Sequence, residues 1–213
     1  MKYKYFLFDW DGTLGDSLPI WVPAFVETFK EFGVEVTERE IGEHVIANWN
    51  GPAELGVTDA DAFFRKAAEK LLPMLPEVKL VPGAKAVLEK IKKMEGKIAI
   101  VTTSKREWVE SALKYLGIAN LIDVFLGKED VRKYKPDPEI LLKALDKLGG
   151  TKDGAVMIGD HKKDIEAANN AGMDSVLFFP KRYERYYDRG KQLSLGADLV
   201  IEDLEELRQI WGE

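Results

Sequence analysis

A short apolar run that ends abruptly on acidic residues limits most strongly how this chain can fold. The run, residues 5–8, has the length of a strand and contains no polar interruption. Such a run is typical of a strand buried on both faces, as in a parallel sheet, although periodicity alone also permits a buried helix. Asp9 and Asp11 follow it, and Gly12 permits a tight turn. Since ligands of parallel sheets bind beyond the carboxyl ends of the strands, this loop is a candidate site.

Beyond Pro82, strand-length apolar runs alternate with segments that place apolar residues at helical spacing. This alternation predicts a doubly wound parallel sheet, which the first apolar run joins, and therefore a Rossmann-like α/β fold. The predicted strands are 97–102, 124–126, 155–160, 175–179 and 199–201, and the predicted helices are 82–94, 106–116, 138–148, 163–171 and 203–211.

The stretch between these two parts has a helical pattern throughout. Helical spacing predicts helices over 20–32, 37–46 and 59–75, with no clear strand between about Gly15 and Leu80. Thr37 is followed three residues later by Glu40, which is the pattern of a capping box. We therefore expect an α-helical cap, residues 16–80, inserted into a catalytic core made of residues 1–15 and 81–213.

Composition excludes several functions. The chain has no cysteine, which rules out disulfides, zinc thiolates and catalytic thiols. Its formal charge of −6 opposes generic binding of nucleic acid. No apolar run approaches the roughly 20 residues that span a bilayer, and no signal-type cleavage site follows the N-terminal run. We expect a cytoplasmic protein with neither a membrane nor a nucleic acid as partner.

Polar side chains stand at the carboxyl ends of three predicted strands. Asp9 follows the first strand, Thr102 ends the second and Asp160 ends a later one. Asp164 comes four residues after Asp160, so both acids lie near one face of a first helical turn. With Asp11, four carboxylates would meet at one sheet edge and repel each other. A hard divalent cation with oxygen ligands, such as Mg²⁺, would neutralise them.

A lysine next to two prolines offers a positive charge that could balance these carboxylates. Lys135 lies directly before Pro136, and Pro138 follows two residues later, so the backbone here is stiff. An ammonium group at this position can balance a carboxylate nucleophile and hold phosphate oxygens. Lys133 is the alternative to Lys135. Thr102 adds a hydroxyl, and amides of the following turn add donors for the same anion.

These residues resemble the motifs of the haloacid dehalogenase-like hydrolase superfamily. The segment from Asp9 to Thr13 is similar to the first motif, Thr102 to the second and Lys135 to the third. Gly159-Asp160 with Asp164 is similar to the fourth motif. Order and spacing both fit, and the core that carries the motifs covers nearly all of the chain outside the cap.

The resemblance implies a role for each acid. Asp9 would attack phosphorus and form an aspartyl phosphate. Asp11 would protonate the leaving group and later activate water. Mg²⁺ would be bound by Asp9 and Asp160, by the backbone carbonyl of Asp11, and with support from Asp164.

The resemblance also implies a substrate class. Gly12, Thr102, Thr103 and Lys135 would hold the phosphoryl group. True dehalogenases of this family lack an acid two residues after the nucleophile, so Asp11 favours phosphate esters. The helical insertion is similar to the cap of phosphoglycolate phosphatase-like enzymes, which act on small phosphorylated metabolites. We therefore expect a Mg²⁺-dependent phosphoric monoester hydrolase. The alternatives are a phosphomutase or other phosphotransferase, and a catalytically silent binding module with the same fold.

Several other residues have two interpretations. His161 lies inside the fourth motif and could be a base, but a solvent-facing position in a first helical turn is favoured. The basic and aromatic segment 181–189 could stack nucleic acid, but its acidic residues favour a solvated connection between strands. Cap residues that either contact a leaving group or pack within the cap are Trp21, His44, Asn48, Trp49 and Asn50.

Overall fold

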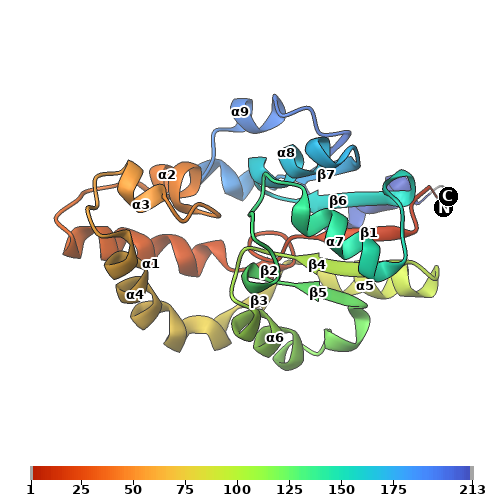
Figure 1. Ribbon diagram of the computed structural model, residues 1–213, viewed down its shortest axis with the longest axis horizontal. Coiled ribbons are helices and arrows are strands. Elements are labelled where there is room, and N and C mark those ends of the chain that lie inside the picture. Colours follow the sequence, from red (N-terminus) through yellow and green to blue (C-terminus); the bar gives the residue numbers. More distant parts are fainter. Residues whose placement is uncertain (1, 212–213) are drawn as a thin grey trace.

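Residues 2–211, which the computed structural model describes, contain a six-stranded parallel sheet (Figure 1). Its strands are β1 Tyr5–Phe8, β4 Lys97–Val101, β5 Val124–Leu126, β6 Ala155–Gly159, β7 Asp174–Phe178 and β8 Leu199–Ile201. The spatial order is β5-β4-β1-β6-β7-β8. The order therefore reverses next to β1, and open α/β sheets bind their ligands at such a point.

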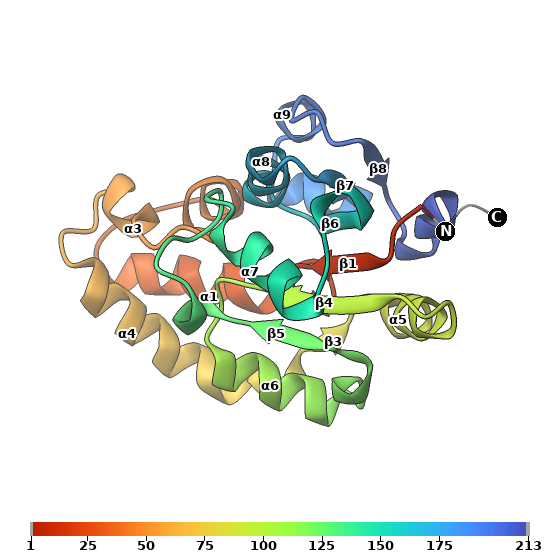
Figure 2. The same cartoon turned by 45° about the vertical axis from the view of Figure 1, so that its right-hand side comes forward.

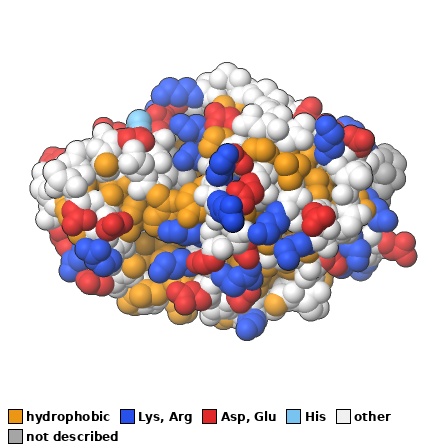
Figure 3. Space-filling model, viewed as in Figure 1, with side chains coloured by type: hydrophobic (Ala, Val, Ile, Leu, Met, Phe, Trp, Pro, Cys, Tyr) orange, Lys and Arg blue, Asp and Glu red, His pale blue; other side chains and the backbone are white. Residues whose placement is uncertain are grey.

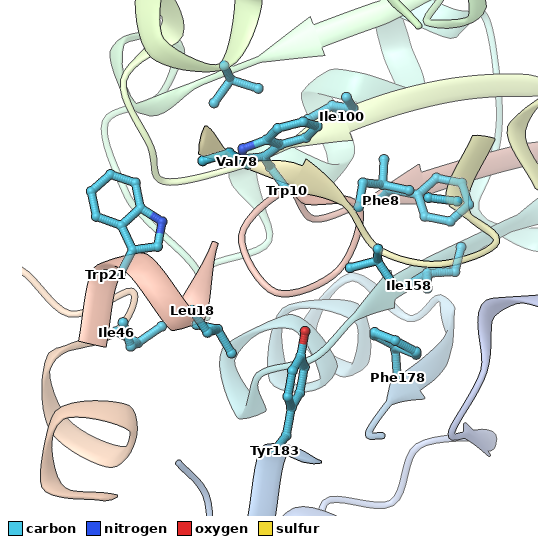
Figure 4. Packing of buried hydrophobic residues seen from close by; sticks show 14 of the residues in the cluster. Phe8, Trp10, Leu18, Trp21, Ile46, Val78, Ile100, Ile158, Phe178 and Tyr183 are labelled. Atoms are coloured by element: carbon cyan, nitrogen blue, oxygen red, sulfur yellow. The ribbon is translucent and has the colours of Figure 1, made fainter. Parts of the chain in front are cut away.

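Helices cover both faces of the sheet, as a doubly wound fold requires. Along β1, Phe6 and Phe8 pack on one face and Leu7 packs on the other. This burial on both faces is the physical reason for an apolar run without alternation. Figure 4 shows Phe8 close to Ile100 and Ile158, its register partners on the two neighbouring strands. One face carries α5 Ala84–Lys93, α6 Arg106–Tyr115 and the 3₁₀ helix η7 Leu204–Ile210, and the other carries α7 Glu139–Leu148 and α8 Lys162–Ala171.

A group of helices lies beyond the carboxyl ends of the strands, on the left in Figures 1 and 2. Its two long helices, α1 Leu18–Glu31 and α4 Ala60–Leu71, pack through aromatic rings, with the centroids of Phe29 and Phe63 4.5 Å apart. The predicted capping box of Thr37 and Glu40 is present. The shorter elements are α2 Glu38–Glu40, the π-helix η1 Ile41–Val45, α3 Gly51–Glu54 and the 3₁₀ helix η2 Leu72–Glu77.

Two short strands correct the expectation that no strand lies between Gly15 and Leu80. β2 Gly15–Asp16 pairs with β3 Lys79–Leu80 in antiparallel fashion, where the chain enters and leaves the helical segment. Two residues are too few to produce a periodic pattern, so hydrophobic periodicity cannot predict strands this short. The helix predicted over 59–75 ends at Leu71 and continues as 3₁₀ turns that contain Pro73 and Pro76.

The segment that follows β7 also differs from its prediction. It forms the 3₁₀ helix η6 Lys181–Arg185 and the helix α9 Arg189–Leu193. Its charged residues face outward, but Tyr183, Tyr186 and Tyr187 are buried. The tyrosines pack on one another, and Tyr183 packs on Phe178, the pair that Figure 4 labels. This segment is therefore part of the core rather than a solvated connection.

Three further 3₁₀ turns connect the main elements: η3 Ala119–Leu121, η4 Lys128–Asp130 and η5 Lys152–Gly154. Within residues 2–211 no helix combines the length and the hydropathy needed to cross a bilayer. The sheet and its helices thus match the predicted α/β architecture, with the helical segment placed over the carboxyl edge of the strands.

Candidate active site

The loop after β1 is a tight turn that places two carboxylates at the edge of the sheet. The amide of Asp9 still bonds to the Ile158 carbonyl of β6 at 2.9 Å, and the chain then turns back so that Gly12 N donates to Gly15 O at 2.8 Å. Gly12 has a φ of +80°, and a Cβ there would lie 2.4 Å from Oδ2 of Asp160. Glycine is therefore required both by the backbone conformation and by the approach of the carboxylate.

Three buried carboxylates meet beside this turn. One oxygen each of Asp9, Asp160 and Asp164 lies within 4.8 Å of the others. Burial raises the pKa of Asp9 to about 7. The charge of Lys135 opposes this shift, and the charge of Asp164 adds to it. Burial also raises the pKa of Asp160 well above its ordinary value, and the charges of Asp9 and Asp164 act in the same direction. The cluster is thus short of positive charge.

Lys135 supplies one positive charge to the cluster. Its Nζ donates to Asp9 Oδ1 at 2.7 Å, to Asp164 Oδ1 at 2.5 Å and to the Val101 carbonyl at 3.2 Å. Burial alone would lower the pKa of this ammonium, but Asp164 and Asp9 reverse the effect and the net pKa is raised. By contrast, the Lys133 side chain is 73% exposed and pairs with Asp137. Lys135 is therefore the lysine that the fold brings to the acidic loop.

The residues present fit a divalent cation. Three carboxylates and one ammonium leave a formal charge of −2 in a buried cluster, and buried charge of this size requires a counter-charge. The side-chain atoms that could bind the metal are all carboxylate oxygens, the type of ligand that Mg²⁺ prefers. Asp164 accepts hydrogen bonds from Lys135 and from the amide of His161. Both oxygens of Asp160 also accept hydrogen bonds, so all three carboxylates remain candidate ligands.

Asp11 points away from this cluster, toward the helical segment. Its Oδ1 accepts from Ser17 Oγ and from Trp21 Nε1, each at 2.7 Å, and its Oδ2 accepts from Ser104 Oγ. Its carboxylate therefore joins three parts of the chain: the start of α1, the loop after β4 and the loop after β1. The side-chain oxygens of Asp11 are thus engaged by these donors, and the role of its backbone carbonyl as a metal ligand stays a prediction.

The loop after β4 contributes hydroxyl groups. Thr102 is buried, and its Oγ1 accepts from the Ser104 amide at 3.0 Å, which fixes the turn. Thr103 and Ser104 line the same cavity as Asp9 and Asp11. Ser104 was not predicted from the sequence. Its position as a third hydroxyl residue directly after Thr102 and Thr103 could have indicated it as part of the site.

His161 corrects the prediction of a solvent-facing side chain. It is only 3% exposed, caps α8 through Nδ1, which accepts from the Lys163 amide at 3.3 Å, and packs against the ring of Tyr187. Burial, with help from Lys163 and Lys162, lowers its pKa to about 3. The imidazole is therefore neutral at physiological pH and acts in packing and capping.

Tyrosines of the segment after β7 hold the acidic turn from below. Tyr183 donates from its hydroxyl to the Gly12 carbonyl at 2.6 Å, and Figure 4 shows this hydroxyl directed at the loop. Tyr187 donates to Asp160 Oδ2 at 3.4 Å, while Thr13 donates to Asp160 Oδ1 at 3.0 Å. Sequence reasoning missed both tyrosines, because their segment is 23 or more residues away from Asp160 in the chain.

A cavity of about 380 Å³ opens above these groups, between the sheet edge and the helical segment. Its floor contains Asp9, Asp11, Thr102 and Asp164. In Figure 3 hydrophobic side chains gather on the left, over the helical segment, beside Lys and Arg side chains at its border with the core. Of the cap residues left open above, Trp21, Asn48 and Trp49 line this cavity, whereas His44 pairs with Glu54 outside it.

Fold and site together define a class of enzyme, namely hydrolases with a Rossmann-like core, an acidic loop after the central strand and a helical insertion above it. Residues 6–178 match the family of haloacid dehalogenase-like hydrolases, and the chain belongs to that family.

The relatives and solved structures agree with this assignment. Pyrophosphatase PpaX of Halalkalibacterium halodurans is 30% identical over 225 residues, which cover 100% of this chain and 98% of the relative. Validoxylamine A 7'-phosphate phosphatase of Streptomyces hygroscopicus subsp. limoneus is 31% identical over 217 residues, covering 97% and 96%. A hydrolase from Pseudomonas syringae superposes with a TM-score of 0.82 at 27% identity, covering 97% of this chain and 96% of that one. The prediction of a phosphatase-type hydrolase is confirmed.

Proposed function

We propose that this protein is a Mg²⁺-dependent phosphatase that hydrolyses a small phosphorylated metabolite through an aspartyl phosphate. The observation that carries the proposal is the buried cluster of Asp9, Lys135, Asp160 and Asp164 on the floor of the cavity. An ionised carboxylate needs no base to attack, and Lys135, 2.7 Å from Asp9, favours that ionised form.

In the first step, an oxygen of Asp9 forms a bond to phosphorus and the ester bond to the leaving group breaks. Asp11 gives its proton to the departing oxygen, so the alcohol leaves neutral. The hydroxyl of Thr102, with Thr103, the backbone at Gly12 and the ammonium of Lys135, holds the phosphoryl oxygens. Positioned charges of this kind are expected to supply most of the rate enhancement.

In the second step, water attacks the phosphorus of the aspartyl phosphate. Asp11 takes a proton from that water, and the bond between phosphorus and Asp9 breaks to release inorganic phosphate and the free carboxylate. Mg²⁺, when held by Asp9, Asp160 and the Asp11 carbonyl with Asp164 in support, would supply positive charge to the transferring group. Ser17, Trp21 and Ser104 orient Asp11 for both proton transfers.

Phosphate release from a panel of small phosphate esters, with Mg²⁺ or with EDTA, tests the proposal. We expect release only with Mg²⁺, loss of turnover in Asp9→Asn, and normal turnover in the control Asp153→Asn, whose side chain is exposed. Mass spectrometry of rapidly quenched enzyme should detect one added phosphoryl group on the peptide that contains Asp9. Turnover that survives Asp9→Asn would refute the mechanism. An isomeric phosphate ester formed without inorganic phosphate would instead identify a phosphomutase.

A further inference from the structure

Five aromatic rings form a continuous arc along the cavity wall. In order they are Trp108, Trp21, Phe25, Phe64 and Trp49, and all five line the cavity. Successive ring centroids are 5.8, 6.3, 6.4 and 4.6 Å apart. We call this set the aromatic arc. Apart from the hydrogen bond from Trp21 to Asp11, the proposed chemistry at phosphorus does not use these rings, because the polar floor would hold the phosphoryl group.

The two ends of the aromatic arc each carry a lysine of the core. The Nζ of Lys105 lies 5.1 Å from the ring centroid of Trp108, and the Nζ of Lys128 lies 3.3 Å from that of Trp49. Arg65 of α4 also lines the cavity, and Asp61 is the acid of the cap that does so. Three cations and one carboxylate leave a formal charge of +2 on this part of the wall.

Two of these cations, Lys105 and Lys128, are half-buried, whereas Arg65 is exposed. Burial lowers the pKa of Lys128 and the charge of Lys105 lowers it further, while Glu129 and Asp61 oppose this shift without cancelling it. An anion beside Lys128 would relieve both this repulsion and the desolvation. These lysines come from the loop after β4 and from η4, and the catalytic cluster does not use them.

The aromatic arc begins at the reacting groups. Trp21 donates from Nε1 to Asp11 at 2.7 Å, so a leaving group protonated by Asp11 departs directly onto the arc. The whole cavity of about 380 Å³ equals the volume of about a dozen water molecules, which is more than a phosphoryl group alone fills. A small, fully polar substrate such as pyrophosphate would leave the five rings in contact with water and gain nothing from them.

Building on the proposed phosphatase function, we propose that the substrate is a phosphate monoester whose leaving group has a planar aromatic body and a second anionic group. The aromatic body would pack on the arc, where ring contacts contribute beyond area burial. The anionic group, a carboxylate or a second phosphate, would lie near Lys128. The leaving group, rather than the phosphoryl group, is thus what the helical segment selects.

Three esters with similar alkoxide leaving groups test this inference: propyl phosphate, benzyl phosphate and 4-carboxybenzyl phosphate. We expect kcat/KM to rise about tenfold or more at each step of this series, the usual range for a well-fitted apolar or charged contact. Benzyl phosphate bearing a second phosphate in place of the carboxylate then distinguishes the two anions.

Two variants separate the two contributions. Trp49→Leu should reduce the advantage of benzyl over propyl phosphate, and Lys128→Met should remove only the advantage of the carboxylate. Phe64→Leu provides a second arc variant should the first fold poorly, and Lys114→Met, at an exposed position of α6, is the matched lysine control. Equal kcat/KM for all three esters, or ratios that neither variant changes, would overturn the inference and leave the phosphatase function intact. Absence of turnover on every ester would count against the phosphatase function itself.

Discussion

Removing the carboxylate of Asp9 should stabilise the metal-free protein, and the gain should grow with pH. Burial raises the pKa of Asp9 from 3.8 to about 7 in the folded protein. The folded state therefore holds this proton more tightly than the unfolded chain does. The resulting penalty is absent below about pH 3.8, where both states are protonated, and it increases until the folded carboxyl ionises near pH 7. Three pH units correspond to roughly 4 kcal/mol.

Urea unfolding in EDTA, at several pH values between about 4 and 7.5, measures this penalty. The penalty is the free energy of unfolding of Asp9→Asn minus that of the wild type. The difference should be near zero at the acidic end and grow by about 1 kcal/mol per pH unit. The two proteins must be compared because His161 changes the free energy of unfolding with pH in the opposite direction, and this change is common to both. Its pKa is lowered from 6.5 to about 3, so both proteins lose stability from this imidazole as pH falls below 6.5.

With saturating Mg²⁺ the wild type, rather than Asp9→Asn, should have the larger free energy of unfolding. At a concentration of one hundred times Kd, a cation that binds only the folded state adds about 2.7 kcal/mol to the wild type. Asp9→Asn lacks one proposed ligand and should gain much less. A stability difference that stays constant with pH in EDTA, or an equal gain from Mg²⁺ in both proteins, would refute this account of the buried cluster.

Three further substitutions test the surroundings of the cluster. Ser104→Ala removes a hydrogen bond to the Asp11 carboxylate and should lower kcat by about tenfold to a hundredfold, since charged hydrogen bonds contribute about 1.5–3 kcal/mol. Tyr187→Phe removes a long contact to Asp160 and should weaken Mg²⁺ binding, measured by calorimetry, by about tenfold. Gly12→Ala should abolish turnover and reduce the free energy of unfolding by about 1–3 kcal/mol, because its Cβ would collide with the Asp160 carboxylate.

Matched controls use exposed residues of the same type. Ser111→Ala and Tyr115→Phe, at exposed positions of α6, should change neither turnover nor the affinity for Mg²⁺. A kcat for Ser104→Ala equal to that of Ser111→Ala would show that Asp11 does not depend on this hydroxyl. Normal turnover in Gly12→Ala would show that the turn tolerates a side chain and that its close packing is unimportant.

The strands and the acidic loop were predictable because their sequence signals are local. Phe6, Leu7 and Phe8 are fully buried on two faces, so the run has no polar interruption, and the acids that follow stand where the strand must end. The same holds for Asp160 after β6. A parallel sheet then brings these ends together without any further information from the sequence.

Other parts of the site were not predictable, because they depend on distant segments. Ser104 reaches Asp11 across 93 residues, and Tyr183 reaches Gly12 across 171. His161 occupies a first-turn position that usually faces water, but the ring of Tyr187 covers it 5.5 Å away. Each contact depends on how a loop folds over the sheet edge, and hydrophobic periodicity carries no signal for that.

Trp21 links the acidic loop, which was predictable, to contacts with a distant segment, which were not. Its helical spacing in α1 is that of an ordinary core residue, but its indole stacks on Trp108 of the core and donates to Asp11. One side chain therefore belongs both to the proposed surface for the leaving group and to the hydrogen bonds of the proposed acid, Asp11. A leaving group that fails to pack on this ring would also leave Asp11 less well ordered. Selection of the substrate and proton transfer are then coupled through a single residue, and mismatched esters should lose kcat as well as affinity.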